Sequence, residues 1–365
     1  MVDYNEQIKQ LEDELKKTKY NKATQGHIGL VKAKLAILKD KQDSRVAQKT
    51  GKSDHGYTVR RSGNGTVILL GFPSTGKSTL LNKLTDANSE VAAYAFTTLS
   101  VIPGMMEHRQ AKIQILDVPG IVHGAASGRG RGREVLAVIR SADLVIVVVD
   151  VNHPEHYPAI IKEAQESGIR INKHHPEVFI KKTSKGGILI GKTVSLHVDD
   201  ETIRQVLREF KVNSADVLIR SPINVDDLID CIEGHKKYIP GIVCVTKSDM
   251  VSTAHLEKVM HELKADIAIS AENNYHLEEL KELIFERLDF IRVYMKEPRK
   301  EADMGEPLII TRNSTIEDVC HKLHKDFVSR FKFARVWGKS TKFPGQRLML
   351  NHTLADGDIL EIHIK

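Results

Sequence analysis

The sequence has few cysteines and no long apolar run. Its three cysteines, Cys231, Cys244 and Cys320, are far apart and odd in number, so no disulfide framework is predicted and a reducing compartment is favoured. The longest apolar run, Leu144–Val149, is too short to cross a bilayer, and the charged start MVDYNEQIKQ is unlike a secretory signal. We therefore expect a soluble cytoplasmic protein without a membrane partner.

No cluster of metal-ligating residues stands out in the sequence. Cys320, His321 and His324 are close together but lack a second ligand pair, which is more typical of ordinary helix residues. The net charge of +6 and the isoelectric point near 9.0 suit an anionic partner such as RNA or a ribosome. Many soluble proteins are mildly basic, so charge alone does not identify that partner.

The clearest motif that is present is a phosphate-binding loop. Residues 67–79 read VILLGFPSTGKST, a short apolar strand, a glycine-bounded loop and the first turn of a helix. In the pattern Gly71-x-x-x-x-Gly76-Lys77-Ser78, backbone N–H groups surround phosphate, the lysine adds positive charge and the serine ligates magnesium. A glycine turn with a surface lysine is the alternative, and the flanking strand and helix argue against it. The predicted nucleotide contacts here are Gly71, Phe72, Pro73, Ser74, Thr75, Gly76, Lys77, Ser78 and Thr79.

Two further motifs at strand ends predict a guanine nucleotide. Asp117 and Gly120 belong to DVPG after the predicted strand 112–117; this carboxylate can hold magnesium through water, and the Gly120 N–H can sense the terminal phosphate. Thr246, Lys247 and Asp249 belong to TKSD after the predicted strand 242–246. The aspartate can accept two hydrogen bonds from guanine that adenine does not offer, and the lysine stem packs along the base.

The base site and the first switch complete the predicted set. Ser270 and Ala271 end the strand 267–270 and place a backbone N–H at the guanine carbonyl. Between the phosphate loop and Asp117 lies YAFTTL, where a threonine can reach both magnesium and the γ-phosphate. Phe96 could equally be a core anchor of an ordinary loop. We predict nucleotide contacts from Phe96, Thr97 and Thr98 as well.

The chain around these motifs reads as several domains. Residues 4–42 are periodic and lysine-rich, and Gly26 and Gly29 suggest a turn between two helices; a solvated hairpin and a partner-binding hairpin fit equally well. Strand–loop–helix units from residue 66 predict a parallel α/β sheet. The expected division is a hairpin 1–43, a linker 44–65, a nucleotide domain 66–290 with an α+β insert at about 170–237, and a C-terminal βαβ-type domain 291–365. Helices are expected at 77–84, 133–140, 159–167, 254–263 and 277–290, and at 200–210, 226–233 and 315–327, the last capped near Ser314.

These motifs together resemble a known family. GFPSTGKST, YAFTTLSVIPG and DVPGIVHGAASGRGRGREVLAVIRSADL are similar to Obg-type GTPases. GIRINKHHPEVFIKK, FKVNSADVLIR and the ending HTLADGDILEIHIK resemble the developmentally regulated GTP-binding (DRG) family. The resemblance implies a P-loop GTPase domain with an N-terminal helical hairpin, a ribosomal-protein-like insert and a C-terminal β-grasp TGS domain. It also implies GTP and GDP as ligands with Mg²⁺, hydrolysis of GTP, a DRG-family regulatory protein as partner and work on translating ribosomes, with no DNA expected.

The resemblance also assigns roles and shows departures. It favours Thr98 over Thr97, so we expect Ser78, Thr98 and Asp117 to hold magnesium, and Lys77, Thr98 and Gly120 to act in hydrolysis. Thr246 replaces the usual asparagine and has shorter reach, which predicts lower affinity. Ser74 stands where potassium-dependent relatives often carry asparagine, so a potassium requirement stays open.

Hydrolysis is expected to be slow. Ile121 occupies the place of the glutamine that orients water in Ras-like proteins, and an apolar side chain cannot do this. His123 is more typical of a solvated loop residue than of a catalytic base. The run SGRGRGR at 127–133 and the lysines Lys181, Lys182, Lys185 and Lys192 fit solvated surfaces and RNA contacts equally well. The predicted function is a slowly hydrolysing GTP switch; the rivals are a nucleotide-stabilised ribosome-binding scaffold and an ATP-using enzyme.

Overall fold

The computed structural model describes residues 4–19, 21, 24–50, 62–85, 102–118, 138–139, 141–166 and 168–364. Two compact units result, each built from separate parts of the chain. One comprises Met1–Tyr57 with Gly168–Tyr238, and the other Thr58–Ser167 with Ile239–Lys365. Within the described residues no helix is both long and apolar enough to cross a membrane.

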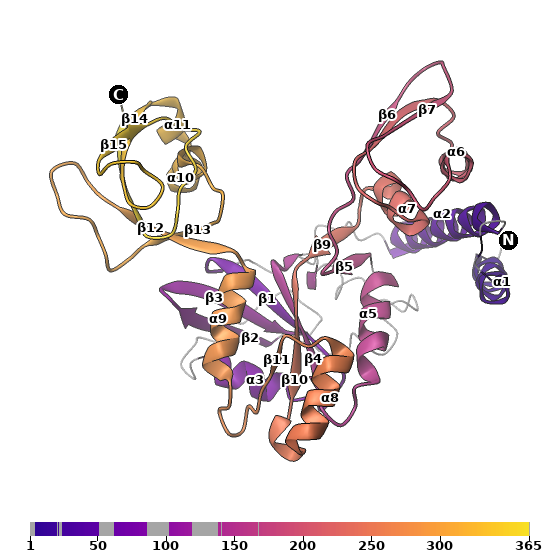
Figure 1. Cartoon of the computed structure of the whole chain (residues 1–365), viewed down its shortest axis with the longest axis horizontal. Coiled ribbons are helices and arrows are strands. Elements are labelled where there is room, and N and C mark those ends of the chain that lie inside the picture. The colour runs from indigo at the N-terminus through magenta and orange to yellow at the C-terminus, as the bar shows by residue number, and fades with distance from the viewer. Residues whose placement is uncertain are drawn as a thin grey trace. The chain divides into compact units, whose positions relative to one another are not determined.

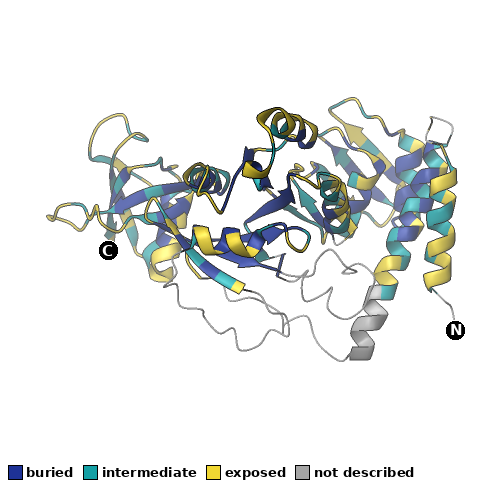
Figure 2. Ribbon diagram, turned by 90° about the horizontal axis from the view of Figure 1, so that it is seen from below, coloured by how far each residue is buried: buried dark blue, intermediate teal, exposed yellow. Residues whose placement is uncertain are grey.

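The nucleotide domain is built on a six-stranded sheet. Its order is β11-β10-β4-β1-β3-β2, and every neighbouring pair is parallel except β3 with β2. All residues of the three central strands β1, β4 and β10 are buried, as their continuous apolar sequences predict (Figure 2). The strands are β1 (Gly65–Leu70), β2 (Ile102–His108), β3 (Ala111–Asp117), β4 (Leu144–Asp150), β10 (Gly241–Thr246) and β11 (Ile267–Ala268).

Helices cover this sheet (Figure 1). Leucines of α3 (Lys77–Leu84) and apolar residues of α9 (Leu277–Arg287) share one core with Val67 and Leu69 of β1. Helix α5 (His156–Glu166) packs against β4, and α8 (Thr253–Leu263) against β11. The sequence predicted a helix to residue 290, which is wrong: α9 ends at Arg287, and Asp289 takes a positive φ of 56° before the next strand.

The C-terminal domain is a mixed five-stranded sheet with two helices. Its order is β13-β12-β16-β14-β15, with β12 and β16 parallel. The sequence analysis missed β12: it predicted a helix through residue 290 and no strand at the start of the C-terminal domain. Apolar residues of these strands and of α10 form a separate core. The elements are β12 (Phe290–Met295), β13 (Leu308–Thr311), α10 (Ile316–Leu323), α11 (Lys325–Ser329), β14 (Phe331–Trp337), β15 (Gln346–Leu348) and β16 (Asp358–Ile364).

The helical segment of this domain differs from expectation in two ways. The helix predicted over 315–327 is two helices, because His324 takes an extended conformation with φ −166° and ends α10. The cap is Thr315 rather than Ser314. Its side chain accepts from the Asp318 N–H while the Asp318 carboxylate accepts from the Thr315 N–H, a reciprocal capping box.

The other unit combines the N-terminal helices with the insert. In the insert, β6 (Val178–Lys182), β7 (Ile188–Lys192) and β8 (Ala215–Ile219) form a sheet of order β6-β8-β7, with α6 (Asp200–Glu209) and α7 (Val225–Glu233). A second small sheet pairs β5 (Ile169–Ile171) with β9 (Lys237–Ile239). Helix α1 (Tyr4–Lys17) packs on α2 (Gln25–Thr50), and α2 packs in turn on α6 and α7.

The two N-terminal glycines are packing residues, not turn residues as expected. Gly26 and Gly29 lie in the first turns of α2, and the chain reverses before them. A Cβ on Gly29 would lie 3.0 Å from Thr202 Cγ2 and 3.4 Å from Val206 Cγ2 of α6. Helix α2 also continues to Thr50, past the expected start of the linker. Glycine therefore allows close approach of two helices that are far apart in sequence.

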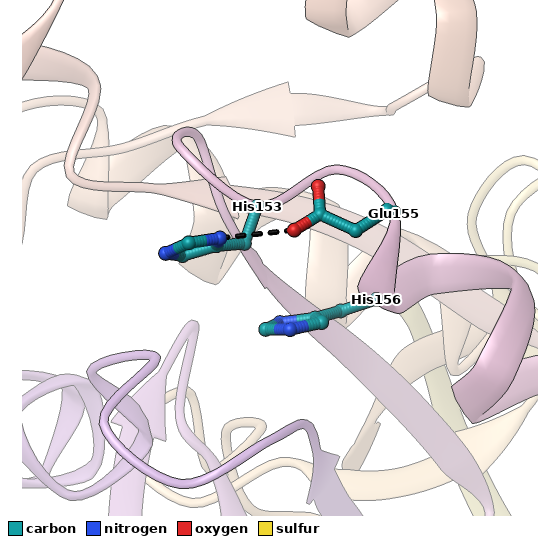
Figure 3. Close-up of side chains that lie close together, drawn as sticks. All are labelled: His153, Glu155 and His156. Carbon is teal, nitrogen blue, oxygen red and sulfur yellow. Dashed lines mark hydrogen bonds and ion pairs between the residues drawn. The ribbon is translucent and has the colours of Figure 1, made fainter.

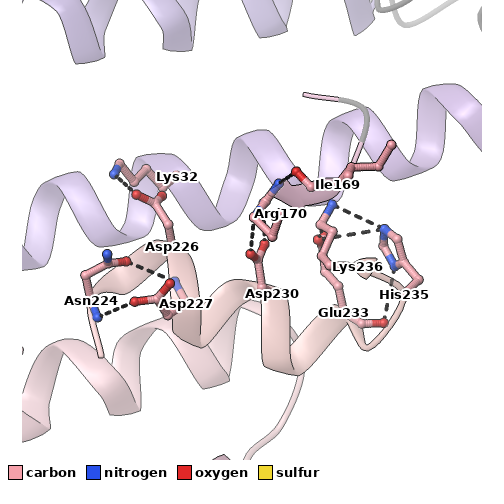
Figure 4. A network of polar contacts seen from close by, with 10 residues as sticks. All are labelled: Lys32, Ile169, Arg170, Asn224, Asp226, Asp227, Asp230, Glu233, His235 and Lys236. Carbon is pink, nitrogen blue, oxygen red and sulfur yellow. Dashed lines mark hydrogen bonds and ion pairs between the residues drawn. The ribbon is translucent and has the colours of Figure 1, made fainter. Parts of the chain in front are cut away.

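A polar network ties the insert to its flanking strand and to α2 (Figure 4). Arg170 of β5 binds Asp230 of α7 with two hydrogen bonds of 2.6 and 2.7 Å, and both side chains are largely buried. Lys32 of α2 contacts Asp226 at 2.7 Å. The Arg170 pair is bidentate and shielded from water, and it joins β5 to α7.

Candidate nucleotide-binding site

The phosphate loop follows β1 and leads into α3. Gly71 is required there, because a Cβ would lie 2.5 Å from the Val148 carbonyl oxygen and 3.0 Å from Thr75 Oγ1. Gly76 and Ser74 have positive φ values of 87° and 64°. A left-handed conformation is accessible to glycine but costs energy for serine. These residues set the backbone path of the loop.

Lys77 lies inside this loop. Its Nζ donates to the carbonyl oxygens of Gly71 at 3.0 Å and Phe72 at 2.7 Å, and the residue is 8% exposed. Burial lowers the pKa of Lys77, an effect that Asp117 partly offsets. A phosphate group beside Nζ would supply the negative charge that the two carbonyls provide only as dipoles.

Ser78 and Asp117 form a pair that fits a magnesium ion. Ser78 Oγ donates to Asp117 Oδ2 at 2.7 Å. The other oxygen, Oδ1, is buried and has no hydrogen-bond partner among the described residues. A buried carboxylate oxygen without a partner, beside a hydroxyl, is the donor set that Mg²⁺ prefers. The magnesium ion would polarise the terminal phosphate and neutralise charge on it.

Thr246 connects the phosphate loop to the base motif, although it lacks the reach of asparagine. Its Oγ1 lies 2.8 Å from the Thr75 carbonyl oxygen and 3.2 Å from that of Val149, and the side chain is buried. The hydroxyl has one proton, so it donates to one of these oxygens at a time. A threonine thus makes the link between the two loops.

Lys247 and Asp150 form an ion pair at the same edge of the sheet. Lys247 Nζ lies 2.7 Å from Asp150 Oδ2, and Lys247 has a positive φ of 60°. Desolvation raises the pKa of Asp150, but hydrogen bonds from Lys247 and Asn152 outweigh it and leave that pKa lowered. This pair holds the lysine stem in place. The sequence analysis missed Asp150, whose signal was its position at the end of β4 beside the TKSD strand.

The base end of the site has one exposed carboxylate and a buried turn. Asp249 lies in the short helix η2 (Ser248–Met250) and is exposed to solvent. The Ser248 N–H donates to the Ile269 carbonyl at 3.1 Å, which joins this turn to the Ser270 and Ala271 segment. The Ser270 N–H donates to the Tyr275 carbonyl, so the Ala271 N–H is the candidate donor to a guanine carbonyl.

Several predicted residues lie outside the described residues. These are Pro119, Gly120, Ile121 and His123 after β3, Phe96, Thr97 and Thr98 of the first switch, and the run at 127–133. The site assembled here is therefore the phosphate loop, the Ser78–Asp117 pair and the base motif. It joins residues from β1, β3, β10 and the turn after β11 at one edge of the sheet, where the strands end.

Two histidines and a glutamate lie beside the phosphate loop, and the sequence analysis did not identify them (Figure 3). His156 stacks on Phe72 of the loop with ring centroids 4.1 Å apart, and His153 stacks on His156 at 5.1 Å. His153 Nδ1 lies 2.9 Å from Glu155 Oε1. The possible ligand atoms of the three residues lie within 4.8 Å of one another. The two imidazoles are nearly parallel, at 21°, so their in-plane lone pairs do not converge on one metal ion. We interpret the cluster as a support for Phe72.

Comparison with known proteins agrees with this geometry. Residues 66–182 match the model described as 50S ribosome-binding GTPase, residues 185–290 match the C-terminal region of that domain, and residues 291–364 match the TGS domain. The chain is 50% identical to a GTP-binding protein of Methanocaldococcus jannaschii, covering 99% of this chain and 93% of the relative. It is 42% identical to developmentally-regulated G-protein 3 of Arabidopsis thaliana and 41% identical to ribosome-interacting GTPase 1 of Saccharomyces cerevisiae, each covering 98% of both chains.

Proposed function

The chain belongs to the family of developmentally regulated GTP-binding proteins, with a P-loop GTPase domain and a TGS domain, and from this premise we propose that it is a slowly hydrolysing GTP switch that works on ribosomes. The observation that carries the proposal is the meeting of the phosphate loop, Asp117 and the TKSD motif at one sheet edge. The name of the yeast relative supports the ribosomal part.

We assign guanine recognition to Asp249. Asp249 is exposed and follows Thr246, which is bonded to the phosphate loop, in the short helix directly after β10. Excess ATP should therefore fail to displace labelled GTP, and efficient displacement would favour an ATP-using enzyme.

Asp249→Asn should shift preference towards xanthosine nucleotides, because the amide inverts the donor and acceptor pattern. Titration of both labelled nucleotides against both proteins measures the shift, and an unchanged preference would place the base elsewhere.

We assign hydrolysis to Lys77, Thr98 and Gly120, with magnesium held by Ser78, Thr98 and Asp117. With Ile121 in place of a water-orienting glutamine, the pure protein should turn over slowly, and a ribosome or a DRG-family regulatory protein should accelerate it. Single-turnover hydrolysis with ribosomes added or withheld, in potassium and in sodium buffers, tests this. Tight GTP binding with negligible hydrolysis in every condition would instead support the nucleotide-stabilised scaffold.

We propose that the remaining parts are binding surfaces. The N-terminal helices and the insert at about 170–237 would form one such surface, and the C-terminal domain from about 291 another. Their separate cores support this division, since each buries its own apolar residues. Cosedimentation with ribosomes, in GTP and in GDP, tests whether these surfaces report the nucleotide state.

A further inference from the structure

The sheet of the insert has one covered face and one open face. Side chains of alternating residues point to opposite faces of a strand. Ile188, Ala215, Val217 and Ile219 face a core that they share with apolar residues of α6 and α7. Helix α2 adds Ala33 to that core. The opposite face, made by the intervening residues, has no covering helix in the described part of the unit.

The open face has an apolar centre. Phe179 of β6 is 55% exposed and Leu189 of β7 is 63% exposed. Strand pairing sets Phe179 opposite Leu218, and Leu218 opposite Gly191, so the three form one row across the sheet. A Cβ on Gly191 would lie 3.5 Å from Leu218 Cδ1. Because glycine has no side chain, the sheet surface beside Leu218 is flat there. A flat group could lie there.

Basic side chains surround this centre. Arg220 lies with its Cζ 5.4 Å from the Phe179 ring centroid. Lys181 follows on β6, and Lys182 and Lys185 continue into the turn towards β7; all three are exposed. None of the ion pairs found among the described residues uses these three lysines, whereas Lys192 pairs with Asp200 at 2.9 Å. Among the described residues of this face, Asp216 is acidic and lies opposite Lys181, and Glu177 borders the face opposite Arg220.

We propose that this open face binds single-stranded RNA. Unpaired bases stack on exposed aromatic rings and on arginine planes, while lysines contact the phosphates. A duplex keeps its bases paired and stacked on one another, so it offers no free base face to Phe179. The proposal rests on the proposed ribosome association, which it deepens by naming the surface and the chemical class of its ligand. It also decides the role of Lys181 and Lys185, which sequence alone left open.

The test is fluorescence anisotropy of the full-length protein with a labelled ten-nucleotide single-stranded RNA. Phe179→Ala should weaken binding about tenfold through loss of stacking, and Phe179→Tyr should restore it. The matched control is Phe343→Ala, which removes a ring of similar exposure, 59%, from the other unit. Lys181→Ala with Lys185→Ala should reduce the magnitude of the slope of log affinity against log salt by about 1.4, since each phosphate contact on a single strand contributes about 0.7.

Three results of the RNA-binding measurements would overturn the inference. They are unchanged affinity in Phe179→Ala, an equal loss in Phe343→Ala, and equally tight binding of a duplex of the same length. Cosedimentation with ribosomes could depend on Phe179 while RNA binding does not. That result would mean that Phe179 contacts a ribosomal protein, and it would also overturn the inference. Ribosome-stimulated GTP hydrolysis is measured separately in the same variants. If ribosomes stimulate hydrolysis while RNA binding does not depend on Phe179, the proposed function stands and this inference does not.

Discussion

Thr246 shows how one hydroxyl can take over a bridging role. Thr246→Val keeps the shape but leaves the Thr75 carbonyl without its donor in a buried place. An unsatisfied buried carbonyl costs about 1 to 3 kcal/mol, so we expect the phosphate loop to shift until this carbonyl regains a partner. The shift disturbs the phosphate-binding geometry, and affinity for GTP and GDP should fall together by about tenfold. Fluorescent nucleotide titration measures this, with Thr253→Val, an exposed threonine at the start of α8, as control. Wild-type affinity in Thr246→Val would show that the link is dispensable.

Cys231 should be unreactive in the native protein although it is only partly buried. Desolvation, with added repulsion from Asp230 and Asp227, raises its pKa to about 11, against 9.0 for an ordinary thiol. The thiolate is the reactive form, so at pH 8 alkylation should be about 100-fold slower than for an unfolded chain. Mass spectrometry after timed iodoacetamide treatment measures the rate. If Cys231 is labelled as fast in the native protein as in urea, its pKa is not raised and the prediction is wrong.

At the scale of elements, the contact of α2 with α6 depends on a residue without a side chain. Gly29→Leu should force the helices apart, because even a Cβ would lie 3.0 Å from Thr202. Overpacking of this kind costs about 1 to 3 kcal/mol. Chemical denaturation followed by circular dichroism should show a lower midpoint for this variant. Lys34→Leu adds the same side chain at an exposed position of α2 and should leave the midpoint unchanged.

The sequence predicted most elements of the nucleotide domain, because central strands are continuous apolar runs and each motif marks a strand end. It failed where two patterns compete. Gly29 is predicted as a turn residue until its helical partner Thr202, 173 residues away in sequence, is known. Strand β12 follows α9 after two residues, so its apolar residues extended the helical pattern. Asp150 could not be assigned a partner before β4 and β10 were known to be neighbours.

The residues of the site could be predicted from the sequence, but the hydrogen bonds and ring contacts between them could not. Lys77, Ser78 and Asp117 follow from motifs whose chemistry needs those residues. The direct Thr246 bond to the phosphate loop depends on the packing of two strand ends, which spacing does not reveal. The stack of His153 and His156 on Phe72 has no motif at all.

At the scale of the whole molecule, the N-terminal helices are part of the insert's core. Deletion of residues 1–50 should uncover the apolar surfaces of α6 and α7 and increase binding of the dye ANS. GTP binding should change less than about twofold, since the nucleotide site belongs to the other unit. Deletion of residues 1–19 is the control, because α1 has no buried residues. Equal dye binding by both truncated proteins would show that α2 does not cover the insert.

The packing of α2 on α6 also determines when the N-terminal helices can fold during translation. Helix α2 is complete at Thr50, but α6 begins only at Asp200. At about 5 to 20 residues per second, the first helices wait roughly 10 to 30 seconds for their partner. During that interval the first strands of the nucleotide domain are synthesised. The apolar residues of α2 that pack on the insert stay exposed to solvent. We therefore expect chaperones to bind the nascent chain during this interval. The unit that contains the N-terminus begins first but is among the last to fold.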